Sequence, residues 1–163
     1  KYLYENDIMN GTSKTEFSPN AELTRGMVVT ILYRMEGEPL TAGAKTFSDV
    51  KAGLYYSKAV DWAAEKNIVN GFSDGTFKPE QPVTREQLAA IISRYAVSKG
   101  IVVYGAANAL ASTDVVSAWT RSNVAWAAAE GILTKTQTTN TTKTASRAEV
   151  ATAIYTYLTK TAK

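Results

Sequence analysis

Cysteine and histidine are both absent from the 163 residues of this chain. Without them there is no disulfide, no thiolate nucleophile, no imidazole base and none of the usual zinc ligands. These absences exclude most hydrolase and transferase mechanisms, and no carboxylate pair has a recognisable catalytic spacing. The calcium-loop pattern of alternating acidic residues is missing too. We therefore expect no enzyme activity, no metal site and no cofactor.

Long apolar runs and a large charge excess are also lacking. No run reaches 18 apolar residues although 45% of the sequence is hydrophobic, so we expect a soluble globular domain without membrane insertion. The net charge of +3 and the pI near 9.0 permit an anionic partner. Proteins that bind nucleic acids usually carry a far larger excess of positive charge, so we do not expect a nucleic acid as a partner. Because the sequence starts at Lys1 without a signal peptide, we interpret it as an excised piece of a longer protein.

The sequence does contain a threefold internal repeat with a period of about 60 residues. Each copy has a hydroxyl residue followed by arginine at the start of an apolar stripe, at Thr24-Arg25, Thr84-Arg85 and Ser146-Arg147. The turn-rich segment Gly71-Phe-Ser-Asp-Gly-Thr-Phe-Lys-Pro79 precedes the second copy, and the others keep only parts of it. A repeat this long predicts symmetrically packed units with a shared core: unit one (1–40), unit two (45–100) and unit three (110–160).

Each complete unit is expected to hold two helices joined by this turn-rich segment. The first helix of unit two is predicted over about 56–67 and that of unit three over 122–130. The second helices begin at the hydroxyl residues, where Gln87 and Glu149 complete capping boxes. Unit one has a methionine in the reciprocal position, so its cap should be half made. The expected fold is mainly α.

The repeated arginines are the first candidate binding residues. Arg25, Arg85 and Arg147 fall at the first position of a helix, where a cation is mildly disfavoured by the helix dipole. A single such arginine is most simply an exposed side chain. Its recurrence favours a receptor for carboxylate or phosphate, formed by the guanidinium and nearby free backbone amides. Since Arg85 is expected to be exposed, Arg85→Ala should weaken binding far more than folding.

Aspartates, tryptophans and glycines recur beside them. Asp49 and Asp114 are helix caps, clamps on a neighbouring arginine or acceptors for sugar hydroxyls. Trp62 and Trp126 either pack in the core or form groove walls that stack on pyranose rings. Gly11 and Gly71 are expected at helix ends, where a bare backbone also admits a ligand, and Ser73 lies in the same turn.

These motifs together resemble the S-layer homology family over nearly the whole chain. The ordered set is Phe47-x-Asp49-Val50, Ala59-Val60-x-Trp62-Ala63, Gly71-Phe-x-Asp74-Gly75-Thr-Phe77-x-Pro79 and Thr84-Arg85-Glu86. Unit one lacks a counterpart of the opening segment, and unit three diverges in its threonine-rich turn segment. The resemblance implies three helix-loop-helix repeats packed with pseudo-threefold symmetry around a small central helix bundle.

The resemblance also implies a secreted module that anchors an exported protein non-covalently to the Gram-positive cell wall. Its expected ligand is a secondary cell-wall polysaccharide bearing pyruvylated N-acetylmannosamine, in grooves between neighbouring repeats. One groove would join Arg25 to Asp49 and Trp62, and a second would join Arg85 to Asp114 and Trp126. Arg147 is the weakest candidate because its partner segment in unit one is missing. The alternative is an assembly module with degenerate sugar grooves that contacts protein neighbours in a surface layer.

Overall fold

The computed structural model describes residues 1–13, 15–43, 47–105 and 109–161, and these residues form a mainly helical fold without a named β-strand. The predicted fold class is confirmed. No helix in these ranges is both long and apolar enough to cross a membrane. The helices in chain order are α1 (Tyr2–Glu5), α2 (Arg25–Met35), α3 (Ser57–Glu65), α4 (Arg85–Ser98), the 3-10 helix η1 (Ala118–Thr120), α5 (Arg121–Ala129), α6 (Lys135–Thr138) and α7 (Arg147–Thr161).

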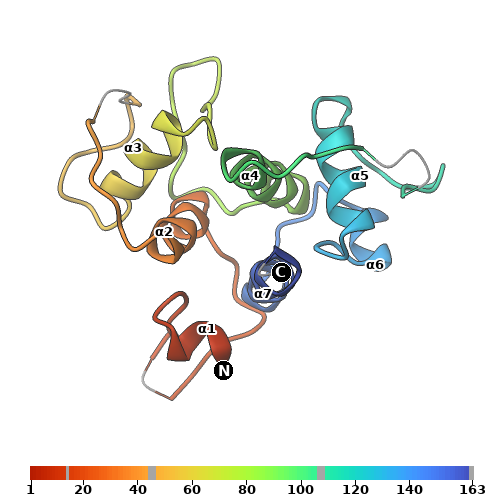
Figure 1. The fold of residues 1–163 in the computed structure, drawn as a ribbon, viewed down its shortest axis with the longest axis horizontal. Helices are drawn as coiled ribbons and strands as arrows, with labels where there is room; N and C mark the ends of the chain where they lie inside the picture. Colours follow the sequence, from red (N-terminus) through yellow and green to blue (C-terminus); the bar gives the residue numbers. More distant parts are fainter. Residues whose placement is uncertain (14, 44–46, 106–108, 162–163) are drawn as a thin grey trace.

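The helices α2, α4 and α7 form a central bundle, and α1, α3 and α5 lie around it (Figure 1). The central helices α2, α4 and α7 are the second helices of units one, two and three, and Figure 1 shows them nearly end-on. Each outer helix packs on the central helix of the preceding unit: α3 on α2, α5 on α4, and α1 on α7. This cyclic arrangement gives the pseudo-threefold symmetry expected from the repeat.

The central helices begin where their capping residues predict. The Thr84 hydroxyl accepts a hydrogen bond from the Gln87 amide, and the Gln87 side chain accepts one from the Thr84 amide, which completes a capping box. Ser146 and Glu149 make the same reciprocal pair in unit three. The Thr24 hydroxyl also accepts an amide, but a methionine at the third position cannot reciprocate. All three predicted starts are confirmed.

The units are joined in a ring by the first backbone amides of the central helices. Each pair of amides donates to carbonyl groups in the turn-rich segment of the next unit, and unit three donates to unit one. The bonds are Arg25 and Gly26 to Gln81 and Pro79, Arg85 and Glu86 to Lys143 and Thr141, and Arg147 and Ala148 to Ala21 and Pro19, at 2.8–3.0 Å. These amides are therefore not free, and the predicted receptor of guanidinium plus backbone amides is wrong on this point.

The outer helices end earlier than the sequence indicated. In α3 the last helical residue is Glu65, and Asn67 takes the left-handed conformation with φ of 56°. The Ile68 amide then donates to the Ala63 carbonyl, which is the bond of a Schellman motif. Gly71 lies beyond this motif in the turn segment, so the expectation that Gly11 and Gly71 end these helices is corrected.

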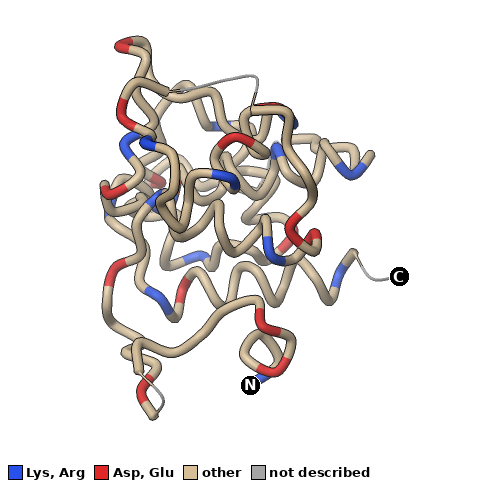
Figure 2. Tube along the Cα trace, turned by 90° about the vertical axis from the view of Figure 1, so that its left-hand side faces the viewer, with Lys and Arg blue, Asp and Glu red and all other residues tan. Residues whose placement is uncertain are grey.

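Charged residues of both signs are spread along the trace in the side view of Figure 2. This distribution agrees with the small net charge and offers no continuous basic face in that view. Any attraction for an anionic partner must therefore come from a local site. The local candidates are the repeated arginines at the junctions between units.

Candidate functional site

A cavity of about 360 Å³ lies where all three units meet. Unit one contributes Arg25, unit two contributes its turn segment around Gly71 and one face of α4, and unit three contributes Trp119. Arg94 and Gln87 on α4 also line it. The cavity thus combines two guanidinium groups with amide and aromatic side chains.

Arg25 is held in this cavity by the unit-two turn segment. Its Nε donates to the Phe77 carbonyl oxygen at 2.9 Å, and its guanidinium carbon lies 4.9 and 4.7 Å from the ring centroids of Phe72 and Phe77. The side chain is nearly buried, with 7% of the residue exposed. Within the described ranges, this Nε bond is its only protein hydrogen bond, so the terminal nitrogens remain available to a ligand.

Burial and a second cation make this guanidinium favourable for an anion. Desolvation, assisted by the nearby charge of Arg94 and partly opposed by Asp49, lowers the pKa of Arg25 to about 10. Burial also lowers the pKa of Arg94. Two incompletely solvated cations side by side repel each other, and a bound carboxylate would relieve that repulsion.

One carboxylate lines the same cavity, but its oxygens are already occupied. Glu86 is buried and accepts hydrogen bonds from the Ser117 hydroxyl at 2.8 Å, the Ser117 amide at 3.2 Å and the Thr141 hydroxyl at 3.0 Å. These bonds tie α4 to unit three. Glu86 therefore acts as a structural link and does not pair with Arg25 among the described contacts.

Trp119 and Arg94 are cavity residues that sequence analysis missed. Trp119 lies on η1 and is 57% exposed, as expected of a ring available for stacking. A signal was present in the repeat, because Tyr55 and Trp119 each stand seven residues before Trp62 and Trp126. Arg94 likewise recurs 60 residues away as Arg34.

The two tryptophans favoured by sequence analysis belong to the core. Only 4% of Trp62 is exposed, and its ring lies 5.7 Å from Tyr33 and 6.3 Å from Tyr95 between the central helices. Trp126 is buried at the equivalent place on α5. Of the two alternatives left open, the structure shows core packing, and it does not bring Trp62 or Trp126 into the expected grooves.

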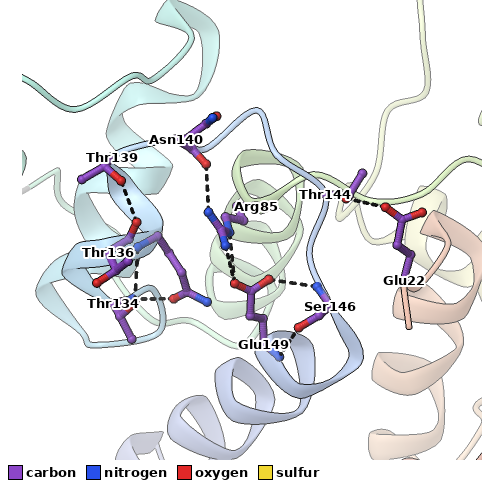
Figure 3. Close-up of polar contacts among 10 residues, drawn as sticks. Glu22, Arg85, Thr134, Thr136, Thr139, Asn140, Thr144, Ser146 and Glu149 are labelled. Carbon is purple, nitrogen blue, oxygen red and sulfur yellow. Dashed lines mark hydrogen bonds and ion pairs between the residues drawn. The ribbon is translucent and has the colours of Figure 1, made fainter. Parts of the chain in front are cut away.

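Arg85 is occupied by the protein itself (Figure 3). Its Nε and one terminal nitrogen donate to Glu149 Oε1 at 3.2 and 2.5 Å, and the other terminal nitrogen donates to the Asn140 carbonyl. The Arg85 side chain is only 12% exposed, so the expectation of an exposed arginine is wrong. Glu149 holds the position at the Arg85 junction that Gln87 holds at the Arg25 junction, and its carboxylate neutralises Arg85.

Arg147 is also partnered, but by unit one. Its Nε donates to the Phe17 carbonyl at 2.8 Å and a terminal nitrogen donates to the Asn10 carbonyl at 2.7 Å, with the Phe17 ring 5.1 Å away. Burial lowers its pKa. The turn segment of unit one thus receives Arg147, as the turn segment of unit two receives Arg25.

The aspartates stabilise loops. Asp49 accepts the Phe77 and Lys78 amides at 2.8 and 2.7 Å, which fixes the carbonyl that holds Arg25. Asp114 accepts the Ala111 amide at 2.7 Å and contacts Lys135 at 3.4 Å, and the amide bond first of all lowers its pKa. Asp49 therefore acts on Arg25 only through the backbone and makes no hydrogen bond with its guanidinium among the described residues.

Of the remaining predicted residues, one lines the Arg25 cavity and the others lie elsewhere. Gly71, with φ of 71°, lines the Arg25 cavity, and a Cβ there would collide with the Phe47 ring. Ser73 is exposed and does not line the cavity. Gly11 lines a different, larger cavity on unit one. No cluster of acidic side chains suited to a metal occurs within the described residues.

The fold and the junctions between its units define a helical repeat module. The family model of the S-layer homology domain matches residues 1–26 and 46–89. The matched segments belong to this family, as their motifs predicted. Together with relatives that are named as surface proteins, the match supports a cell-surface localisation and an anchoring role.

Relatives match only a short part of their own length. An endoglucanase of Bacillus sp. (strain KSM-635) is 38% identical over 94 residues, which cover 58% of this chain and 10% of the relative. An amylopullulanase of Thermoanaerobacterium thermosulfurigenes is 31% identical over 136 residues, covering 80% and 7%. Cell surface glycoprotein 1 of Acetivibrio thermocellus is 27% identical over 90 residues, covering 53% and 4%. The chain therefore spans a tenth or less of these proteins.

Proposed function

We propose that the chain is a non-catalytic anchor that attaches an exported protein to an anionic secondary cell-wall polysaccharide. The ligand of this proposal is pyruvylated N-acetylmannosamine. The observation that carries it is the cavity in which the nearly buried, incompletely paired Arg25 lies with Arg94 and the exposed Trp119. A cavity of this size accommodates one terminal sugar unit.

The chemistry of the ligand matches these residues. A pyruvate ketal holds a carboxylate rigidly on a pyranose ring, and the terminal nitrogens of Arg25 can bind it in a charge-assisted pair. Trp119 offers a flat ring for the apolar face of the sugar. Such a pair contributes on the order of 1.5–3 kcal/mol, so removal of pyruvate should weaken binding about 10- to 100-fold.

The proposal places one ligand at the Arg25 junction instead of one each at Arg25 and Arg85. Arg85 already has a carboxylate partner in Glu149, and Arg147 uses two nitrogens on carbonyl groups of unit one. Among the three repeated arginines, only Arg25 has no hydrogen bond from either terminal nitrogen to a described residue. Asp114, Trp126, Ser73 and Gly11 are not part of the proposed site.

The test is a pull-down with purified cell-wall sacculi before and after the polysaccharide is stripped. The anchor should sediment with intact walls and stay in solution with stripped walls. Trp119→Ala should lose most of the binding, whereas Tyr104→Ala, which removes an exposed ring away from the cavity, should not. Equal retention on stripped walls would sink the sugar hypothesis.

That same result would favour the alternative, an assembly module that contacts neighbouring proteins in a surface layer. The observation in its favour is the closure of the Arg85 junction by Glu149, since a sugar groove that has decayed would look like this. The alternative predicts retention that depends on surface-layer protein and is indifferent to pyruvate.

A further inference from the structure

The wall of the Arg25 cavity contains an asparagine directly before a glycine. Asn70 lines the cavity together with Gly71, is exposed to solvent, and its side chain makes no hydrogen bond to a described residue. The sequence has one other Asn-Gly pair, Asn10-Gly11, at the equivalent place in unit one. Unit three has Thr134-Lys135 at this place.

An asparagine followed by glycine is open to deamidation, because glycine has no side chain to hinder an approach of the backbone. The Gly71 nitrogen forms a bond to Asn70 Cγ, the bond from Cγ to the side-chain nitrogen breaks, and ammonia leaves with the backbone amide proton. Water then opens the cyclic imide to aspartate or isoaspartate. The reaction consumes one water molecule and replaces a neutral amide by a carboxylate.

The backbone around Asn70 leaves room for this attack. The Gly71 amide donates no hydrogen bond to a described residue, and the Asn70 carbonyl accepts none, so this peptide group can turn. At Asn10 a terminal nitrogen of Arg147 holds the carbonyl at 2.7 Å. Both glycines lie close against their turn segments, so packing does not separate the two pairs. Asn70 should therefore react faster than Asn10.

The product would place a negative charge in the cavity that we propose for the ligand. Arg25 is nearly buried there, its terminal nitrogens make no hydrogen bond to a described residue, and Arg94 is a second cation on the same lining. A carboxylate at position 70 would pair with these groups. The Arg85 junction shows the result of such pairing, because Glu149 occupies that arginine from within the protein.

We propose that Asn70 is a deamidation site, and that the carboxylate formed there occupies the anion site of Arg25 and Arg94. The protein would thus lose affinity for its ligand as it ages, without cleavage of the chain. The loss of sugar affinity rests on the proposed function, whereas the reaction and the new ion pair do not.

The test incubates the chain at physiological temperature and mildly alkaline pH, which favours attack by the backbone nitrogen. Peptide mapping by mass spectrometry should locate the mass change from amide to acid at Asn70, several-fold faster than at Asn10. Fresh Asn70→Asp should melt at a higher temperature than the wild type, because its carboxylate relieves the repulsion between Arg25 and Arg94. Its affinity for a pyruvylated disaccharide should be at least tenfold lower.

Asn70→Gln is the matched control, because its longer side chain keeps the amide but closes the imide ring far more slowly. Affinity should decline during the incubation in the wild type and stay at its starting value in Asn70→Gln.

Three outcomes would overturn the proposal: no deamidation at Asn70, deamidation at Asn10 ahead of Asn70, or an Asn70→Asp variant that melts no higher than the wild type. A fresh wild type that does not bind the sugar would overturn the proposed function alone. The mass change and the melting temperature are measured without sugar, so the two proposals can fail separately.

Discussion

Arg85 and Glu149 form an ion pair across the junction of units two and three, with 2.5 Å between the nitrogen and oxygen atoms and a separation of 64 positions in sequence. Glu149 is the third residue of α7, and its equivalent in α4 is Gln87, which lines the cavity of Arg25. The third residue of each central helix thus helps to decide whether the arginine of the preceding unit is available to an external anion.

Arg85→Ala is expected to destabilise the fold and to leave ligand affinity unchanged. The substitution removes a largely buried, charge-assisted pair and leaves Glu149 without its cation, at a cost of about 1–3 kcal/mol in the free energy of unfolding. Denaturant unfolding and calorimetric titration with a pyruvylated disaccharide measure the two effects. Loss of affinity at unchanged stability would contradict the structural role of Arg85 and support the expectation from sequence that Arg85 binds the ligand.

Gln87→Glu is expected to close the Arg25 site. The new carboxylate can still accept the Thr84 amide, as Glu149 accepts the Ser146 amide, so the capping box should survive. It would also pair with Arg25, and affinity for the pyruvylated sugar should fall about tenfold or more. Gln87→Met, which copies unit one, is the matched control without charge. Equal affinity of the wild type and Gln87→Glu would show that Arg25 does not meet the ligand.

Two tryptophan substitutions should separate binding from folding. Trp119→Ala removes an exposed ring and should abolish most sugar affinity while changing the free energy of unfolding by less than about 0.5 kcal/mol. Trp62→Ala empties a site between central helices and should cost about 3–5 kcal/mol. Thermal melts and titrations on both variants check this. If Trp119→Ala unfolded the chain, Trp119 would be a core residue and not a ligand-binding ring.

Acid should weaken the Arg85–Glu149 contribution. Burial raises the pKa of Glu149, but hydrogen bonds from Arg85 and the Ser146 amide outweigh burial and leave the pKa below its usual value. A lowered carboxyl pKa contributes stability that is complete above the unfolded value of about 4.3 and is lost as pH falls through the folded value. The stability gap between the wild type and Glu149→Gln should therefore be widest near neutral pH and shrink below about pH 4. A gap independent of pH would refute the pair.

The fold could be predicted from sequence because it rests on local signals repeated three times. Thr84 with Gln87 and Ser146 with Glu149 determine where central helices start, and the apolar stripes determine which faces are buried. The motifs led to the correct family and to the pseudo-threefold arrangement. These features depend on residues within a few positions of one another.

The site was harder to predict because its parts come from three units. Nothing local shows that the Arg25 and Arg85 side chains meet different residues, since the difference arises at Gln87 and Glu149, more than 60 positions away. The choice of Trp62 and Trp126 as ligand-binding residues was wrong for a related reason. A helical amphipathic pattern does not show which of two aromatic residues seven positions apart faces the core, and Trp119 proved to be the exposed one.

The central claim is that Arg25 and its neighbour Arg94 bind the carboxylate of a pyruvylated sugar. Calorimetric titration of the wild type and Arg94→Ala with the disaccharide, with and without pyruvate, tests it most directly. We expect one binding site per chain and a tenfold or greater loss of affinity when pyruvate is removed from the disaccharide. In Arg94→Ala this loss of affinity should be smaller, and the melting temperature should stay unchanged. Equal affinity of the wild type for both sugars would contradict it.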